Sequence, residues 1–242
     1  MIPQEIDPRV PGGGEGEDIG RWSARALAGA RRIDWLKSVP EEEVLALVRA
    51  GRVQLWHDQD MVVTQEEACQ DCFLILEGGL RATVRRGDGI EFLLSDAGAG
   101  ETVGLVGLYR ATIFPHTMRA LGAALTLRLD RALLEPVLLR HPQCGLALLE
   151  MMSLRFALTL KFLSLTALAP LRDQLHGRLE IWAVHQELRG LPEPHVLRGS
   201  QRELAAMMGV SRQSVNAALH ELETAGAVRM SYGCIVLLQR LQ

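Results

Sequence analysis

The sequence is poor in cysteine, carries no polybasic run and does not begin with an apolar leader. Four cysteines among 242 residues are too few for a disulfide scaffold of this size. Residues 1–8 contain two prolines and two acids instead of a basic region followed by an apolar run, so we expect no secretion signal. The formal net charge of −3 excludes a basic field over the whole chain. We therefore expect a protein of the reducing cytoplasm.

Signatures of catalysis are missing as well. No glycine-rich phosphate loop leads into a helix, and no serine, histidine and aspartate stand in a recognisable local arrangement. The acidic run Glu41–Glu43 follows Pro40, a pattern typical of the solvated first turn of a helix rather than of an acid and base pair. We therefore expect that the protein is not an enzyme.

Long hydrophobic runs are limited to one stretch, residues 144–169, which three charged residues interrupt: Glu150, Arg155 and Lys161. Each of these charges would cost about 2.5–3.5 kcal/mol at the centre of a bilayer. Hydrophobic residues make up 48% of the chain and charged residues 23%, which are ordinary values for a globular protein. We therefore interpret the stretch as a helix that packs against protein rather than lipid.

Composition divides the first half of the chain into a tail and a β-rich region. Residues 1–21, rich in proline, glycine and acids, predict a flexible tail. Residues 22–130 begin with helical patterns up to Gly51 and continue with short β-rich runs, which predict an antiparallel sandwich or roll and an α+β fold. The runs are 52–56, 61–64, 72–76, 80–85, 90–94 and 123–129, and turn signals such as Gly78-Gly79 and Gly87-Asp88-Gly89 separate them.

Residues 131–169 predict helices, with Asp130 as an N-cap and a break at His141-Pro142. On the second helix, apolar residues follow a 3-4-4-3-4 spacing, which makes a seam of nearly heptad period. The seam consists of Leu149, Met152, Phe156, Leu160, Leu163 and Ala167. We expect it to pack against a second copy of the chain; the alternative is an internal core helix of a monomer. Pro170 then ends the helix and predicts a hinge before the last domain, residues 170–242.

Two short helices are expected in the last domain. Ser200 and Glu203 form a capping box, which begins a helix over residues 201–208. Ser211 is the expected N-cap of the next helix, over residues 212–224. The short connection between these two helices is typical of a helix-turn-helix.

Small and apolar residues allow these two helices to cross closely. Ala205 stands at the crossing, and Gly209 suits a tight turn with positive φ. The expected shared core consists of Leu204, Met208, Val210, Val215, Ala218, Leu219 and Leu222. Two strand-like runs around Gly233 follow and predict a wing.

The outward face of the second helix predicts contacts with DNA. Arg212, Gln213 and Asn216 lie in the part that a recognition helix inserts into the major groove, where Arg binds guanine and Gln or Asn binds adenine. Contacts with phosphates are expected from Ser200, Gln201, Arg202, Ser211 and Ser214. The alternative is a winged-helix module that binds protein, which would have no salt-dependent affinity for DNA.

These motifs resemble those of the CRP/FNR superfamily of bacterial transcription regulators. The segment Ser200–Asn216 is similar to the family's DNA-reading motif, and Phe73–Leu80 is similar to a β-roll strand that ends in a glycine turn. The resemblance implies a cyclic-nucleotide-binding-like β-roll as the sensor domain, a long dimerisation helix and a winged helix-turn-helix. It also implies a homodimer whose partners are double-stranded DNA and RNA polymerase.

The effector pocket departs from the family pattern. Members that bind cyclic nucleotides use a glutamate for the ribose and an arginine for the phosphate, but Leu105 stands at the glutamate position, and residues 114–117 contain no arginine. We expect no binding of cAMP by the usual contacts, because burying a phosphate without a cation is costly. A different effector, or none, remains open, and no cofactor is predicted. The residues that would line its pocket are Gly104, Leu105, Tyr109, His116 and Thr117.

Cys69 and Cys72 suggest an alternative, a redox-sensing or metal-sensing regulator. Two cysteines do not complete a zinc site, and Cys72 falls where a strand residue would point into the roll, so we predict no metal site. A lone histidine such as His57 or His116 is more often a hydrogen-bonded loop residue than a haem ligand.

Overall fold

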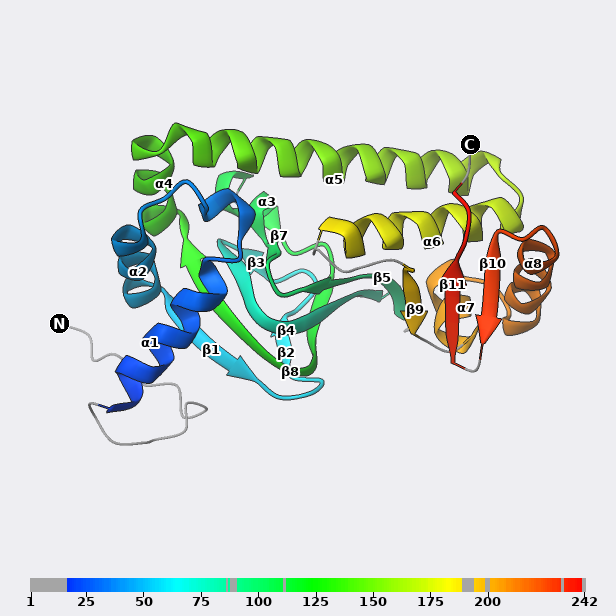
Figure 1. Ribbon diagram of the computed structural model, residues 1–242, viewed down its shortest axis with the longest axis horizontal. Helices are drawn as coiled ribbons and strands as arrows, with labels where there is room; N and C mark the ends of the chain where they lie inside the picture. Colours follow the sequence, from blue (N-terminus) through cyan, green and yellow to red (C-terminus); the bar gives the residue numbers. More distant parts are fainter. Residues whose placement is uncertain are drawn as a thin grey trace. The chain divides into compact units, whose positions relative to one another are not determined.

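The computed structural model describes residues 17–85, 87, 91–110, 112–188, 194–198, 201–231 and 233–240 (Figure 1). The chain divides by packing into two compact units. Unit 1 comprises residues up to Arg81 together with Asp96–Ala147, and unit 2 comprises Ala82–Ser95 together with Leu148–Gln242. The predicted α+β class is confirmed, with an antiparallel sheet, a long helix and a C-terminal helix-turn-helix. The domain boundaries that the sequence predicts, at residues 130 and 169, differ from the boundaries of these two packing units. They stay a prediction.

The main sheet has six strands, and its central path runs β1-β8-β4-β5. Strands β2 and β6 extend it by pairing with β8 and β4, and β3 pairs with β7 in a separate ribbon. The strands are β1 (Arg52–Trp56), β2 (Met61–Val63), β3 (Ala68–Cys69), β4 (Asp71–Arg85), β5 (Glu91–Gly98), β6 (Thr102–Val103), β7 (Thr112–Ile113) and β8 (Thr117–Asp130). Leu74, Leu76, Leu125 and Leu127 are almost completely buried, so the core lies against β4 and β8.

One predicted turn is wrong. Residues 78 and 79 do not separate two strands, because β4 runs through both glycines without a break. Gly78 has a φ of 71°, and a Cβ atom there would lie 2.2 Å from the carbonyl oxygen of Ala123. The glycine is therefore needed for the close approach of β8, and it produces an irregularity inside a strand rather than a turn.

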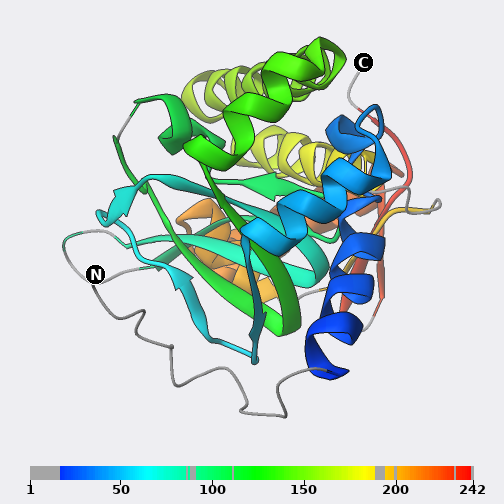
Figure 2. The same ribbon diagram turned by 90° about the vertical axis from the view of Figure 1, so that its left-hand side faces the viewer.

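In unit 1, helices come before the first strand of the main sheet and after its last strand. The helix α1 (Glu17–Ala30) begins inside the segment 1–21 that we predicted as a tail, so the predicted end of the tail is wrong. The rest of that segment, residues 1–16, lies outside the described residues. Figure 2 shows α1 beside α2 (Glu41–Ala50), and the short 3-10 helix η1 (Asp34–Leu36) connects them.

The helix α4 (Arg131–Arg140) begins as predicted. The carboxylate of Asp130 accepts a hydrogen bond from the backbone N–H of Leu133 at 2.9 Å, which satisfies one of the free donors of the first turn. The short helix α3 (Leu105–Arg110) was not predicted, because the expected pocket segment has no capping residue before it.

Among the described residues, unit 2 holds most of α5, the three helices that follow it and a three-stranded sheet of order β10-β11-β9. The elements are α5 (Pro142–Leu168, of which residues 148–168 belong to this unit), α6 (Leu171–Leu188), β9 (Val196–Arg198), α7 (Gln201–Met208), α8 (Arg212–Thr224), β10 (Val228–Ser231) and β11 (Cys234–Leu237). The helix break predicted at Ala169-Pro170 is confirmed. Among the described residues, no helix is long and apolar enough to cross a membrane.

Candidate nucleic-acid interface

The helices α7 and α8 cross around a small residue, as the sequence predicts. Ala205 is 6% exposed, Val215 is completely buried, and Gly209 in the turn has a φ of 66°. The hydroxyl of Ser211 accepts a hydrogen bond from the backbone N–H of Ser214 at 3.1 Å, so the predicted N-cap of α8 is confirmed. The predicted core also forms: Leu204, Ala218, Leu219 and Leu222 are buried, and Met208 and Val210 pack against them.

Polar side chains occupy the opposite face of α8. Arg212 and Gln213 are exposed at the first turn, and Asn216 is half-buried one turn later. Arg202, at the start of α7, is exposed as well. Ser200, which we predicted to contact a phosphate, lies outside the described residues. The arrangement offers guanidinium and amide groups at the tip of one helix, which are the groups that recognise base edges in a major groove.

A hydrogen-bonded link joins the two helices at this tip. Gln201 Nε2 donates to Asn216 Oδ1 at 2.8 Å, and Arg212 Nε donates to Gln201 Oε1 at 3.5 Å. Gln201 therefore lies between two residues that we predicted to contact bases. Sequence reasoning missed this link, because the spacing of residues within one helix does not show which side chain of the neighbouring helix lies opposite.

The wing follows α8 as an antiparallel pair. Val228 lies opposite Leu237, and Ser231 lies opposite Cys234. Val228 is buried, whereas Arg229 and Ser231 are exposed. The backbone N–H of Met230 donates to Glu223 at 2.8 Å, and this bond fixes the wing to the end of α8.

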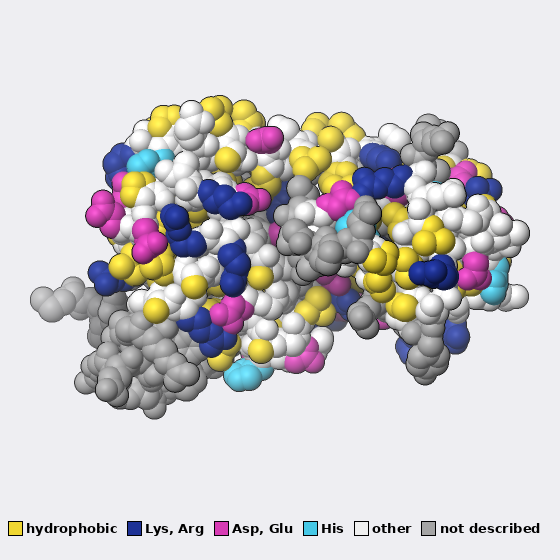
Figure 3. All heavy atoms as spheres, in the orientation of Figure 1, with side chains coloured by type: hydrophobic (Ala, Val, Ile, Leu, Met, Phe, Trp, Pro, Cys, Tyr) yellow, Lys and Arg dark blue, Asp and Glu magenta, His cyan; other side chains and the backbone are white. Residues whose placement is uncertain are grey.

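The predicted dimer seam is an exposed apolar surface in the single chain. Leu149, Phe156 and Leu163 are 63%, 64% and 61% exposed, Leu160 is 47% exposed, and Met152 is half-buried. Figure 3 shows hydrophobic side chains along the upper edge of the view, where α5 lies. Exposed hydrophobic side chains that recur on one helix face are characteristic of an interaction surface.

The residues predicted to line an effector pocket lie on two segments. Gly104, with a φ of 82°, leads into α3, where Leu105 is buried and Tyr109 is 49% exposed. His116 and Thr117 lie at the start of β8. Burial lowers the pKa of His116, and Thr117 Oγ1 accepts a hydrogen bond from the backbone N–H of Gln65 at 3.0 Å. The guanidinium of Arg131 lies over the Tyr109 ring, 5.1 Å from its centre, and makes a cation–π contact with it.

The two cysteines of the alternative redox hypothesis are buried. Burial raises the pKa of Cys72 to about 12 and also raises the pKa of Cys69. Both thiols are therefore protonated at neutral pH, although the thiolate is the form that reacts with oxidants and metals. Within the described ranges, no three residues of metal-binding type lie together.

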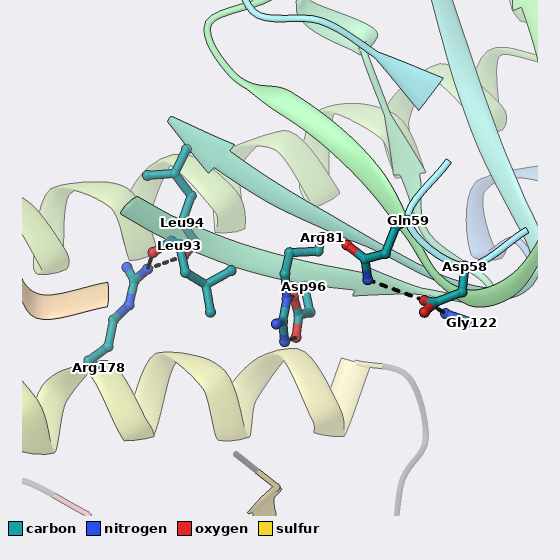
Figure 4. A network of polar contacts seen from close by, with 8 residues as sticks. All are labelled: Asp58, Gln59, Arg81, Leu93, Leu94, Asp96, Gly122 and Arg178. Carbon is teal, nitrogen blue, oxygen red and sulfur yellow. Dashed lines mark hydrogen bonds and ion pairs between the residues drawn. The ribbon is translucent and has the colours of Figure 1, made fainter. Parts of the chain in front are cut away.

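A half-buried arginine that sequence reasoning did not single out connects α6 to the part of β5 that belongs to the same unit (Figure 4). Arg178 donates to the backbone carbonyls of Leu93, at 3.3 Å, and of Leu94. Its guanidinium lies 4.4 Å from the centre of the Phe162 ring on α5, and burial lowers the pKa of Arg178 to about 10. Arg178 therefore ties α6 and α5 to the backbone of β5.

Two family models match the chain. Residues 53–141 match the cyclic nucleotide-binding domain, and residues 177–242 match the Crp-like helix-turn-helix domain. No curated protein matches the chain.

Several solved structures share the fold. They include the c-di-GMP responsive global regulator CLP of Xanthomonas campestris, with a TM-score of 0.65 and 19% identity over 83% of this chain and 100% of that one. A CooA mutant from Carboxydothermus hydrogenoformans has a TM-score of 0.62 and 20% identity over 81% and 87% of the two chains. FixK2 from Bradyrhizobium japonicum has a TM-score of 0.60 and 16% identity over 78% and 93%. At these identities the likeness shows the fold.

Proposed function

Because the chain belongs to the CRP/FNR family of DNA-binding transcription regulators, we propose that it acts as a homodimer that reads a roughly palindromic operator with the tip of α8. The observation that carries this proposal is the exposed group of Arg212, Gln213 and Asn216 on a helix whose opposite face is buried. Two copies related by a two-fold axis would read half-sites about 34 Å apart.

In this proposal, the tip of α8 contacts bases and its surroundings contact phosphates. Arg212, Gln213 and Asn216 read base edges. The DNA backbone on either side would be held by Arg202, Ser211, Ser214 and Ser200, the last of which lies outside the described residues. The exposed wing residues Arg229 and Ser231 add further polar groups. The protein would act in the cytoplasm, where a bacterial chromosome lies, together with RNA polymerase.

The proposal is tested by selecting ligands from a pool of random-sequence duplexes and measuring their affinity at several salt concentrations. We expect a two-fold symmetric consensus and an affinity that falls at least about tenfold between 50 and 200 mM salt, because bound phosphates release counterions. Duplexes of the same length with scrambled sequence serve as the control. No selected sequence and no salt dependence would support the winged-helix module that binds protein.

The second part of the proposal is that the sensor domain does not bind cAMP through the family's usual contacts. Leu105 stands at the position where relatives that bind cyclic nucleotides have the glutamate for the ribose. Its side chain is buried and apolar, so it offers no acceptor to a ribose hydroxyl group. Isothermal titration of the full-length protein with cAMP is expected to show no saturable binding at micromolar concentrations. Micromolar or tighter binding would contradict this prediction.

The same titration with c-di-GMP tests an effector that a structural relative suggests, since CLP is described as responsive to it. Native mass spectrometry of the purified protein complements it, because a tightly bound effector would add its mass to that of the chain.

A further inference from the structure

We propose that Gln201 sets the direction of the Asn216 amide and thereby decides which class of base Asn216 reads. This inference rests on the proposed function of α8. It assigns to Gln201 the role of a positioning residue on α7, in place of the phosphate contact expected from the sequence.

The argument begins with Arg212, whose guanidinium has only donors. Its Nε faces Gln201 at 3.5 Å, so the atom of Gln201 on that side is the acceptor Oε1. The amide of Gln201 then directs its Nε2 to the other side. There it meets Asn216 at 2.8 Å, and the atom it meets is the acceptor Oδ1. A donor-only residue at one end therefore fixes the direction of both amides.

The consequence for Asn216 follows from the planar geometry of an amide. Its carbonyl oxygen points towards Gln201 on α7, so its NH₂ group points away from that residue. An asparagine that binds adenine with two hydrogen bonds needs both its oxygen and its nitrogen at the base edge. Asn216 instead presents donors, which suit a base with a carbonyl acceptor in the major groove, guanine or thymine, better than adenine, whose acceptor there is N7 alone.

Partial burial makes this orientation firm. Gln201 and Asn216 are both half-buried, and their bond lies at the contact between α7 and α8. Turning the Asn216 amide over would place two N–H groups against each other and leave Asn216 Oδ1 without the donor of Gln201. Such a mismatch costs more than an ordinary hydrogen bond contributes, because the groups are partly shielded from water.

The test is the substitution Gln201→Glu in the full-length protein, followed by selection from random-sequence duplexes. A carboxylate is an acceptor only, so it still accepts from Arg212 Nε but forces Asn216 to donate, which turns the Asn216 amide over. One position of each half-site is then expected to change from guanine or thymine to adenine or cytosine, by about five- to tenfold in relative affinity. The preference at the position that Arg212 reads is expected to stay.

A second variant separates orientation from charge. Gln201→Leu removes the amide without adding a charge, and we expect it to relax the same position so that both classes of base are accepted. Thermal unfolding followed by circular dichroism verifies that both variants are folded.

Three results would overturn the inference. If Gln201→Glu weakens binding to all sequences equally, Gln201 contacts phosphates, and the proposed function stands without this inference. If both variants lose thermal stability but keep the parental consensus, the bond only joins the two helices. If the parent itself selects no sequence, the proposed function fails, and this inference fails with it.

Discussion

Replacing Leu160 with glutamate is expected to turn the protein from a dimer into a monomer. Leu160 is 47% exposed on α5 and lies within the seam defined by Leu149, Met152, Phe156 and Leu163. In a parallel helix pair, the substitution would bring two carboxylates into an apolar interface, which disfavours association. Sedimentation at a concentration where the parent is dimeric measures the change directly.

Operator affinity should fall with the dimer. In a dimer, binding of one recognition helix makes the binding of the second half-site intramolecular. This raises the operator affinity about 100-fold or more, and a monomer loses that gain. Affinity for a single half-site should stay the same, because α8 is far from the substitution in the chain and its core is unaffected.

The matched control is Leu139→Glu on α4. Leu139 is 76% exposed and lies outside the seam, so the same change of chemistry should leave the dimer intact. If Leu160→Glu remained dimeric, or if Leu139→Glu also became a monomer, the seam would be wrongly assigned.

Replacing Arg212 with alanine is expected to reduce specific binding by about 1–3 kcal/mol, which is about 5- to 150-fold. Arg212 is exposed at the first turn of α8, so the truncation leaves no cavity in the core. The loss should be largest at the base pair that Arg212 reads, because a guanidinium discriminates guanine from the other bases through two acceptors, with a smaller relaxation at the position of Asn216. Competition between the operator and duplexes mutated at each position measures this profile.

Arg202→Ala is the companion to Arg212→Ala. Arg202 is exposed at the start of α7, where we propose a contact with phosphate. Its loss should weaken binding to all sequences alike and reduce the salt slope by about 1. Operator binding by Arg212→Ala as tight as that of the parent would show that the recognition face is wrongly assigned.

The C-terminal domain with the helix-turn-helix was predictable from the sequence because its signals are local. A proline marks the start of α6, a serine cap marks the start of α8, and Gly209 marks the turn before it. The observed bounds of α7 and α8 coincide with the predicted ones, and α6 begins directly after Pro170. Each of these signals acts within about one helical turn, so it can be interpreted without knowledge of the tertiary structure.

The sheet was harder to predict because its partners are distant in the chain. Arg52 lies opposite Arg128, and nothing in either short run identifies the other. Gly78 was interpreted as part of a turn, although its role depends on the approach of Ala123 from another strand. The contacts of Gln201 and Arg178 escaped prediction for the same reason, since each joins two elements through side chains that the local pattern does not pair.

Arg178 and the strand it holds have a consequence for anyone who builds chimeras between relatives. The chain passes from one compact unit to the other after Arg81, after Ser95 and after Ala147. A crossover at Pro170 would therefore take α6 from one parent and its carbonyl partners at Leu93 and Leu94 from the other. Chimeras that inherit residues 82–95 and α6 from the same parent should be the ones that keep the Arg178 contacts and fold stably.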